Sequence, residues 1–199
     1  MSFRKVGGLV SASEPPERLL RSSRMMSVQP LGEEPSDIAS SIEYHAFLSP
    51  CFSPATFKLD RAFFATAESV RYRLIHQWNE TCFHFDKVDP KQTYYLSMEY
   101  IAGRALRNAL GNLGLEGAYA AALKKLGYEL EDIVEEEKEA PFGNGEKGRV
   151  ASCILDSMAT LNLPAWGYGL RYKYGLFKEP IIKNGQEEIT EDWLEKFSP

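Results

Sequence analysis

A glycine-rich turn that runs directly into an amphipathic segment constrains the fold of this 199-residue chain more than any other feature. Gly143, Gly145 and Gly148 match the pattern G-x-G-x-x-G, and the periodicity after them predicts a helix that begins near Arg149. Glycine lets a backbone approach a ligand closely, and the free N–H groups and dipole at a helix start attract an anion. The sequence therefore predicts either an anion-binding turn or a plain tight loop between two helices.

A dinucleotide-binding domain fits this context poorly. Such a domain needs a strand that leads directly into the turn and an acidic residue about 20 positions beyond it. Here an acidic segment precedes the turn, and residues 163–175 contain no Asp or Glu. The sequence also lacks the P-loop, H-E-x-x-H and G-x-S-x-G motifs.

Hydrophobic periodicity predicts an α/β fold. Helices are expected over residues 60–79, 104–113, 116–126 and 129–138, strands over 93–100 and 166–176, and a hairpin turn at Asn184-Gly185. Gly114 and Gly127 are expected to end the second and third helices. The acidic helix 129–138 has Leu130, Ile133 and Val134 to bury, and the helix after the glycine turn has Val150, Ile154, Met158 and Leu161.

Composition indicates a globular chain with a core, since 44% of the residues are hydrophobic and 26% are charged. The net charge of −5 argues against a nucleic-acid or anionic-membrane binder, and no apolar run approaches the about 20 residues that span a bilayer. Cys51, Cys82 and Cys153 form no C-x-x-C pair, which suits a reducing compartment and indicates neither a disulfide nor a zinc site. The scattered histidines, His45, His76 and His84, suit structural roles better than catalysis.

Residues 1–40 differ from the rest of the chain and carry no useful helical or strand period. Their serines and arginines would suit a plastid transit peptide, which is poor in acidic residues. The segment nevertheless contains Glu14, Glu17, Glu33 and Glu34. We expect a disordered leader here, with the transit peptide as the alternative.

Several longer motifs occur in a specific order along the chain. They are residues 93–100, 103–106, the glycine turn, 153–162, 165–172 and 175–177. In this order they resemble the α-1,4-glucan (glycogen/starch) phosphorylases, most closely the plant cytosolic type, from about Ser41 to Pro199. The resemblance implies that residues 41–199 form part of an incomplete, Rossmann-like N-terminal domain of the glycosyltransferase-B type.

Phosphorylases of this family use pyridoxal 5'-phosphate and inorganic phosphate to release glucose 1-phosphate from α-glucan ends. The resemblance implies a homodimer when full length and a cytoplasmic location, with the plastid as the alternative. It places the cofactor lysine and the basic phosphate-binding cluster in a C-terminal domain beyond Pro199. We therefore expect no catalytic residue, no cofactor lysine and no metal site in this chain, which alone should be inactive. The alternative is a non-catalytic binding or assembly module.

The resemblance assigns the substrate- and phosphate-binding loop to the glycine turn. By position, the matching residues are Gly143, Asn144, Gly145, Gly148 and Arg149. Glu146 and Lys147 stand where the family has glycine and leucine, and Ile101 and Ala102 also depart from the plant pattern. A carboxylate about 4 Å from a phosphate would cost about 4 kcal/mol at an effective dielectric constant of 20.

Glu99 is the remaining candidate, because its alternating neighbours place it in a strand that should be buried. A buried carboxylate must be paired or have a raised pKa. One interpretation pairs Glu99 with Arg104 as a structural ion pair. The resemblance offers the other, in which Glu99 supports the active site near the phosphate.

Overall fold

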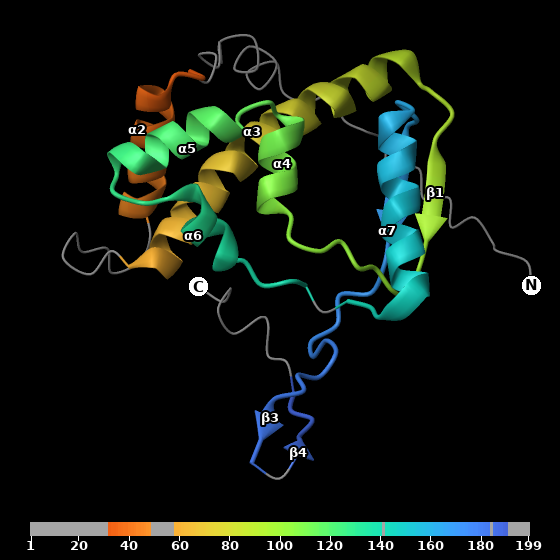
Figure 1. Cartoon of the computed structure of the whole chain (residues 1–199). Coiled ribbons are helices and arrows are strands. Elements are labelled where there is room, and N and C mark those ends of the chain that lie inside the picture. Colours follow the sequence, from red (N-terminus) through yellow and green to blue (C-terminus); the bar gives the residue numbers. More distant parts are fainter. Residues whose placement is uncertain (1–31, 49–57, 141, 184, 191–199) are drawn as a thin grey trace, which may run out of the picture. The chain divides into compact units, whose positions relative to one another are not determined.

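A computed structural model describes residues 32–48, 58–140, 142–183 and 185–190, which apart from Gly32 belong to one unit, Glu33–Pro199. Its helices are α2 Pro35–Phe47, α3 Leu59–Val88, α4 Leu106–Asn112, α5 Glu116–Lys125, α6 Leu130–Glu135 and α7 Gly145–Thr160. Its strands are β1 Thr93–Leu96, β2 Ala165–Tyr168, β3 Ile181–Ile182 and β4 Gly185–Gln186. Figure 1 shows these elements in place.

The hydrophobic core lies among the helices α2 to α6. Within the described residues, all its members fall between Ile38 and Val134, and Ile42, Leu110 and Leu123 are among the most deeply buried. Helix α3 contributes only its first half, because its buried residues run from Ala62 to Arg73 although the helix continues to Val88. The second half of α3 extends beyond the core.

A polar network crosses this core between α3 and α5. The hydroxyl groups of Ser69 and Tyr119 lie 2.9 Å apart, and Arg73 donates from Nε to the same Tyr119 oxygen at 3.2 Å. Ser69 and Tyr119 are fully buried. Hydrogen bonds compensate these groups for the loss of water, so the network fixes how α3 meets α5.

A second part of the unit consists of β1, α7 and β2. The strands pair in parallel, with Tyr94 opposite Trp166 and Leu96 opposite Tyr168. Helix α7 packs against β2, where a Cβ at Gly167 would lie 2.7 Å from a methyl carbon of Leu155. A parallel pair needs a crossover connection, and α7 lies within it.

The sequence located the core helices α3 to α6, but it did not predict α2, which supplies Ile38 and Ile42 to the core. Gly114 and Gly127 have φ of 69° and 88° and follow α4 and α5, as predicted, because glycine adopts this left-handed conformation without strain. The predicted burial of Leu130, Ile133 and Val134 in α6 is confirmed. The predicted hairpin is confirmed as the antiparallel pair β3–β4, although Asn184 lies outside the described residues.

Other boundaries were wrong. Helix α3 is longer than the predicted 60–79, and the predicted strands 93–100 and 166–176 are reduced to β1 and β2. The helix expected near Arg149 begins at Gly145. Val150 and Leu161 are exposed rather than buried, because the face of α7 that meets the chain after β1 carries Gly148 and Ala151.

Three further predictions from the sequence concern the leader, the cysteines and membrane-spanning segments. Helix α2 begins at Pro35, inside the predicted leader 1–40; residues 1–31 lie outside the described part, so the leader stays a prediction. Cys82 and Cys153 are free thiols, and Cys51 is outside the described part. No helix among the described residues has the length and apolar character that crossing a membrane requires.

Candidate functional site

The candidate site lies where the two parallel strands end. The chain after β1 carries residues 97–101, the chain after β2 carries residues 169–176, and the glycine turn at the start of α7 comes between them. In α/β folds, ligands bind outside the carboxyl ends of parallel strands. The topology therefore brings together three motifs that are far apart in sequence.

Two backbone hydrogen bonds fasten the glycine turn to the chain after β1. The Tyr100 N–H donates to the Phe142 carbonyl at 3.1 Å, and the Ile101 N–H donates to the Gly148 carbonyl at 3.0 Å. The turn is thus held at both ends against the same short segment. Backbone contacts therefore help to fix its position.

Each glycine of the G-x-G-x-x-G pattern is required for its own physical reason. A Cβ at Gly143 would lie 2.9 Å from the Tyr100 nitrogen, and a Cβ at Gly148 would lie 2.9 Å from Cγ1 of Ile101. Gly145 has no such neighbour but has φ of 54°, a conformation that other residues rarely adopt. The pattern is therefore explained by packing at two positions and by backbone conformation at the third.

Glu99 is held beside this turn. Its Oε2 accepts a long hydrogen bond from the Asn144 N–H at 3.4 Å, and Ser97 donates from Oγ to its carbonyl at 2.8 Å. The prediction that Glu99 lies in a buried strand was wrong, because β1 ends at Leu96 and Glu99 is half-buried. The alternative partner Arg104 instead contacts Glu135 at 2.9 Å, which raises the pKa of the guanidinium.

A cavity of about 220 Å³ opens at this point. It is lined by Glu99, Phe142, Gly143, Asn144, Tyr172, Tyr174, Gly175 and Leu176. These residues include one carboxylate, one amide and three aromatic rings, and no basic residue is among them. Such a lining suits a neutral, hydroxyl-rich ligand that packs against rings and donates hydrogen bonds to an acid.

The aromatic lining residues were not identified as site residues from the sequence. Tyr172 reaches the cavity because its hydroxyl donates to the Met98 carbonyl at 2.9 Å, across the gap between the two strand ends. The alternation of residues 166–176 was visible, but it indicated a strand with two faces. The strand ends at Tyr168, and the chain beyond it turns across the site.

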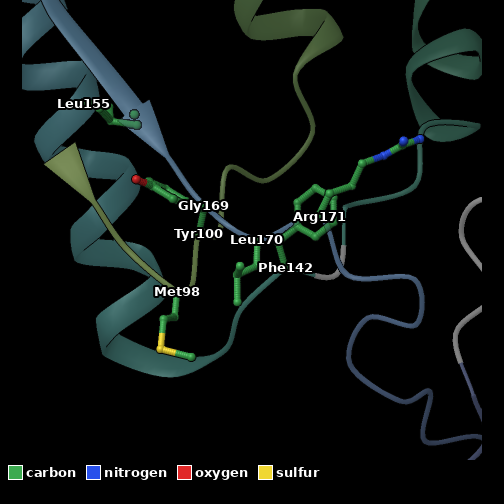
Figure 2. A pocket seen from close by; sticks show the side chains of 8 residues that line it. Met98, Tyr100, Phe142, Leu155, Gly169, Leu170 and Arg171 are labelled. Carbon is green, nitrogen blue, oxygen red and sulfur yellow. The ribbon is translucent and has the colours of Figure 1, made fainter. Parts of the chain in front are cut away.

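A second cavity of about 440 Å³ lies next to Tyr100 (Figure 2). It is lined by Met98, Tyr100, Phe142, Leu155, Gly167, Gly169, Leu170 and Arg171. Tyr100 donates from its hydroxyl to the carbonyls of Tyr95 and Tyr168, which ties the two strand ends together. Burial, and to a lesser extent the neighbouring Tyr95 hydroxyl, raises the pKa of Tyr100 above its ordinary value.

The residues that depart from the family pattern lie around the turn. Glu146 and Lys147 are exposed in the first turn of α7, and neither is among the residues that line the two cavities. An acidic residue in a first turn interacts favourably with the helix dipole, so Glu146 suits the helix start. Ile101 fills the space left by Gly148, whereas nothing in the structure explains Ala102.

Comparison with known proteins supports the sequence resemblance. The carbohydrate phosphorylase family model matches residues 123–199. The α-glucan phosphorylase H isozyme of Vicia faba is 65% identical over 193 residues, which is 97% of this chain and 22% of the relative. The cytosolic α-glucan phosphorylase 2 of Arabidopsis thaliana is 68% identical over 170 residues, which is 85% of this chain and 20% of the relative.

This chain belongs to the carbohydrate phosphorylase family. It spans about a fifth of the length of the curated relatives it matches. Plastid phosphorylases are also similar to it: the chloroplastic/amyloplastic L isozyme of Ipomoea batatas is 62% identical over 164 residues, or 82% of this chain and 17% of the relative. The phosphorylase relatives thus include both cytosolic and plastid isozymes.

Proposed function

We propose that this chain forms the glucosyl-binding wall of an α-glucan phosphorylase, which releases glucose 1-phosphate from α-1,4-glucan with inorganic phosphate. The observation that carries the proposal is the cavity where Glu99, the glycine turn and Tyr172 meet. These residues come from three separate motifs of the phosphorylase resemblance. A shared cavity is what a common ligand requires.

The proposed roles follow from the chemistry of the lining. The carboxylate of Glu99 accepts hydrogen bonds from sugar hydroxyl groups, and the rings of Tyr172 and Tyr174 pack against the sugar. The start of α7 presents backbone N–H groups that favour negative charge developing on the substrate. The lining of this cavity includes no cation, so we infer that the cations that hold phosphate lie outside it.

The cofactor of this family is not held by the cavity residues described here. Pyridoxal 5'-phosphate is attached through a lysine, and neither cavity has a lysine among its lining residues. Lys173 instead lies with its Nζ 5.0 Å from the centre of the Tyr174 ring. The residues present do not fit the cofactor, so its attachment and chemistry belong to another part of the phosphorylase.

The absence of lysine from the lining of both cavities favours a second candidate function. Without a cofactor lysine at either cavity, the chain by itself is a non-catalytic binding or assembly module of a phosphorylase. Its glucan contacts would remain, but phosphorolysis would require the rest of the polypeptide. We propose a cytosolic location for either candidate function, because the cytosolic isozyme of Arabidopsis thaliana is 68% identical to this chain. The plastid is the alternative, because the plastid isozyme of Ipomoea batatas is 62% identical.

A chimaera tests the catalytic proposal. The part of this chain that aligns with the Solanum tuberosum H isozyme, 68% identical over 172 residues, replaces the matching stretch of that enzyme. Release of glucose 1-phosphate by the chimaera is then measured. We expect activity, and we expect Glu99→Gln to lower kcat/KM by at least about tenfold, or about 1.4 kcal/mol. Glu129→Gln, at an exposed residue away from the cavity, is the matched control. A folded, dimeric but inactive chimaera would favour the non-catalytic module.

The effect of Glu146 and Lys147, which replace the glycine and leucine of the family pattern, can be tested in the same chimaera. Because Glu146 and Lys147 are exposed, the effective dielectric constant near them is close to that of water. At a distance of about 4 Å, the Glu146 carboxylate then destabilises a bound phosphate by about 1 kcal/mol, which lowers the affinity for phosphate about fivefold. We expect Glu146→Gly with Lys147→Leu to lower the KM for phosphate by about that factor. An unchanged KM would mean that phosphate binds farther from the turn.

A further inference from the structure

The side chain of Tyr100 joins the ends of the two parallel strands. Its hydroxyl group donates to the carbonyl oxygen of Tyr95 in β1 at 3.2 Å and to that of Tyr168 in β2 at 3.1 Å. Tyr168 is the last residue of β2, and its carbonyl also accepts from the Ser97 N–H at 3.0 Å. One hydroxyl group therefore bridges two segments that are far apart in the sequence.

The ring of Tyr100 is fitted closely against the chain after β2, as Figure 2 shows. A Cβ at Gly169 would lie 2.8 Å from Cε2 of this ring and 3.3 Å from the Ser97 carbonyl oxygen. The ring of Tyr95 packs on it edge to face, with 6.5 Å between the ring centres. The missing side chain of Gly169 therefore provides the space that the Tyr100 ring occupies.

The backbone of Tyr100 also reaches the glycine turn. Its N–H donates to the Phe142 carbonyl at 3.1 Å, and a Cβ at Gly143 would lie 2.9 Å from the same nitrogen. Tyr100 thus has hydrogen bonds to β1, to β2 and to the chain that leads into the turn. These are the three segments whose ends meet at the candidate site.

Tyr100 itself is not among the residues that line the cavity of about 220 Å³, whereas Glu99 before it and Tyr172 after β2 are. Tyr172 bridges the same gap in the opposite direction, because its hydroxyl donates to the Met98 carbonyl at 2.9 Å. A tyrosine from each segment therefore donates to a carbonyl of the other. A bridge that lies behind a cavity acts on a ligand by holding the cavity walls in place.

We propose that Tyr100 is a positioning residue for the proposed glucosyl site, whose hydroxyl group holds the wall that carries Glu99 against the wall that carries Tyr172. The inference rests on the proposed function, since it concerns the same cavity. Loss of the hydroxyl group leaves the ring beside Gly169 but removes one of the two tyrosine bridges. Looser walls bind the sugar less tightly in the ground state and in the transition state alike.

The chimaera with the Solanum tuberosum H isozyme tests this role through Tyr100→Phe, which removes the hydroxyl group and keeps the ring. We expect the KM for α-1,4-glucan to rise at least about threefold and kcat to stay within about twofold, the pattern of lost uniform binding. Amides in residues 97–101 and 169–172 should exchange at least about threefold faster without substrate. Leu123, in the helical core, should exchange at an unchanged rate.

Tyr94→Phe is the matched control, because it makes the same chemical change one strand position away from Tyr95. The Tyr94 hydroxyl donates to Oε1 of Gln92 at 3.0 Å, and Tyr94 lines neither cavity. This variant should keep the KM, the kcat and the exchange rates of the unaltered chimaera. A rise in KM of the same size in Tyr94→Phe would overturn the proposal.

The remaining outcomes separate this inference from the proposed function. If Tyr100 has a structural role alone, Tyr100→Phe lowers the melting temperature, or fails to fold, without a rise in the KM of the folded enzyme. Either result, in a chimaera that is active when unaltered, would overturn the positioning role and leave the proposed function intact. An unaltered chimaera without activity would instead overturn the proposed function, and with it the role of Tyr100 in binding the glucosyl group.

Discussion

Replacing Gly143 with alanine should loosen the glycine turn, although it adds only one methyl group. The new Cβ would lie 2.9 Å from the Tyr100 nitrogen and 3.2 Å from its carbonyl oxygen, where ordinary contacts begin at 3.4 Å. The turn would have to move by about 0.5 Å, because backbone atoms cannot rotate away as a side chain can. That movement strains the 3.1 Å hydrogen bond between the Tyr100 N–H and the Phe142 carbonyl.

The expected cost follows from both effects. Overpacking of a close contact costs about 1–3 kcal/mol, and a weakened hydrogen bond contributes within the same range. Because the helical core does not include the turn, the loss should appear as local opening rather than as global unfolding. Amide exchange in residues 97–101 and 142–149 should therefore accelerate by about 5- to 150-fold.

Gly111→Ala is the matched control. A Cβ at Gly111 would meet no atom within 4 Å, and the residue lies inside α4. Alanine in a helix is about 0.5–1 kcal/mol more stable than glycine, so this variant should gain stability in urea denaturation. If Gly143→Ala left exchange in the turn unchanged, the close approach of the turn to Tyr100 would be refuted.

Three further predictions concern stability. Tyr119→Phe should cost about 1–3 kcal/mol in urea denaturation, since it removes the hydroxyl group that contacts both Ser69 and Arg73; an unchanged midpoint would mean that these contacts contribute nothing. Glu137→Ala should cost about 1–2 kcal/mol, because the two carboxylate oxygens accept the N–H groups at the start of α4 at 2.7 and 2.9 Å; retained exchange protection there would contradict this. The pKa of Tyr100 is raised, so the folded chain binds more protons than the unfolded chain above about pH 10. The contribution of Tyr100 to stability should be complete below that pH and lost as pH rises through the raised pKa. Tyr100→Phe should therefore reduce the pH dependence of the denaturation midpoint between about pH 9 and 12. The same pH dependence in both proteins would refute the raised pKa of Tyr100.

The candidate site was only partly accessible from sequence. The glycine turn stood out in the sequence because its three glycines follow a spacing that packing and backbone conformation require, whereas its role as the substrate-binding loop stays a prediction. Glu99 was also singled out, but the interpretation that pairs it with Arg104 was wrong, because Arg104 contacts Glu135. Sequence proximity favoured Arg104, whereas the fold brings Asn144 to Glu99 from 45 residues away.

Local chemistry determined what the sequence could predict by itself. Helices α3 to α6, the burial of Leu130 and Ile133, and the ends of α4 and α5 depend on periodicity and on glycine conformations within a few residues. Only the tertiary structure decided that Val150 is exposed, that the strands are short and that Tyr172 lines the cavity. These features depend on the parallel pairing of two segments about 70 residues apart, and no local pattern specifies which faces such a pairing leaves open.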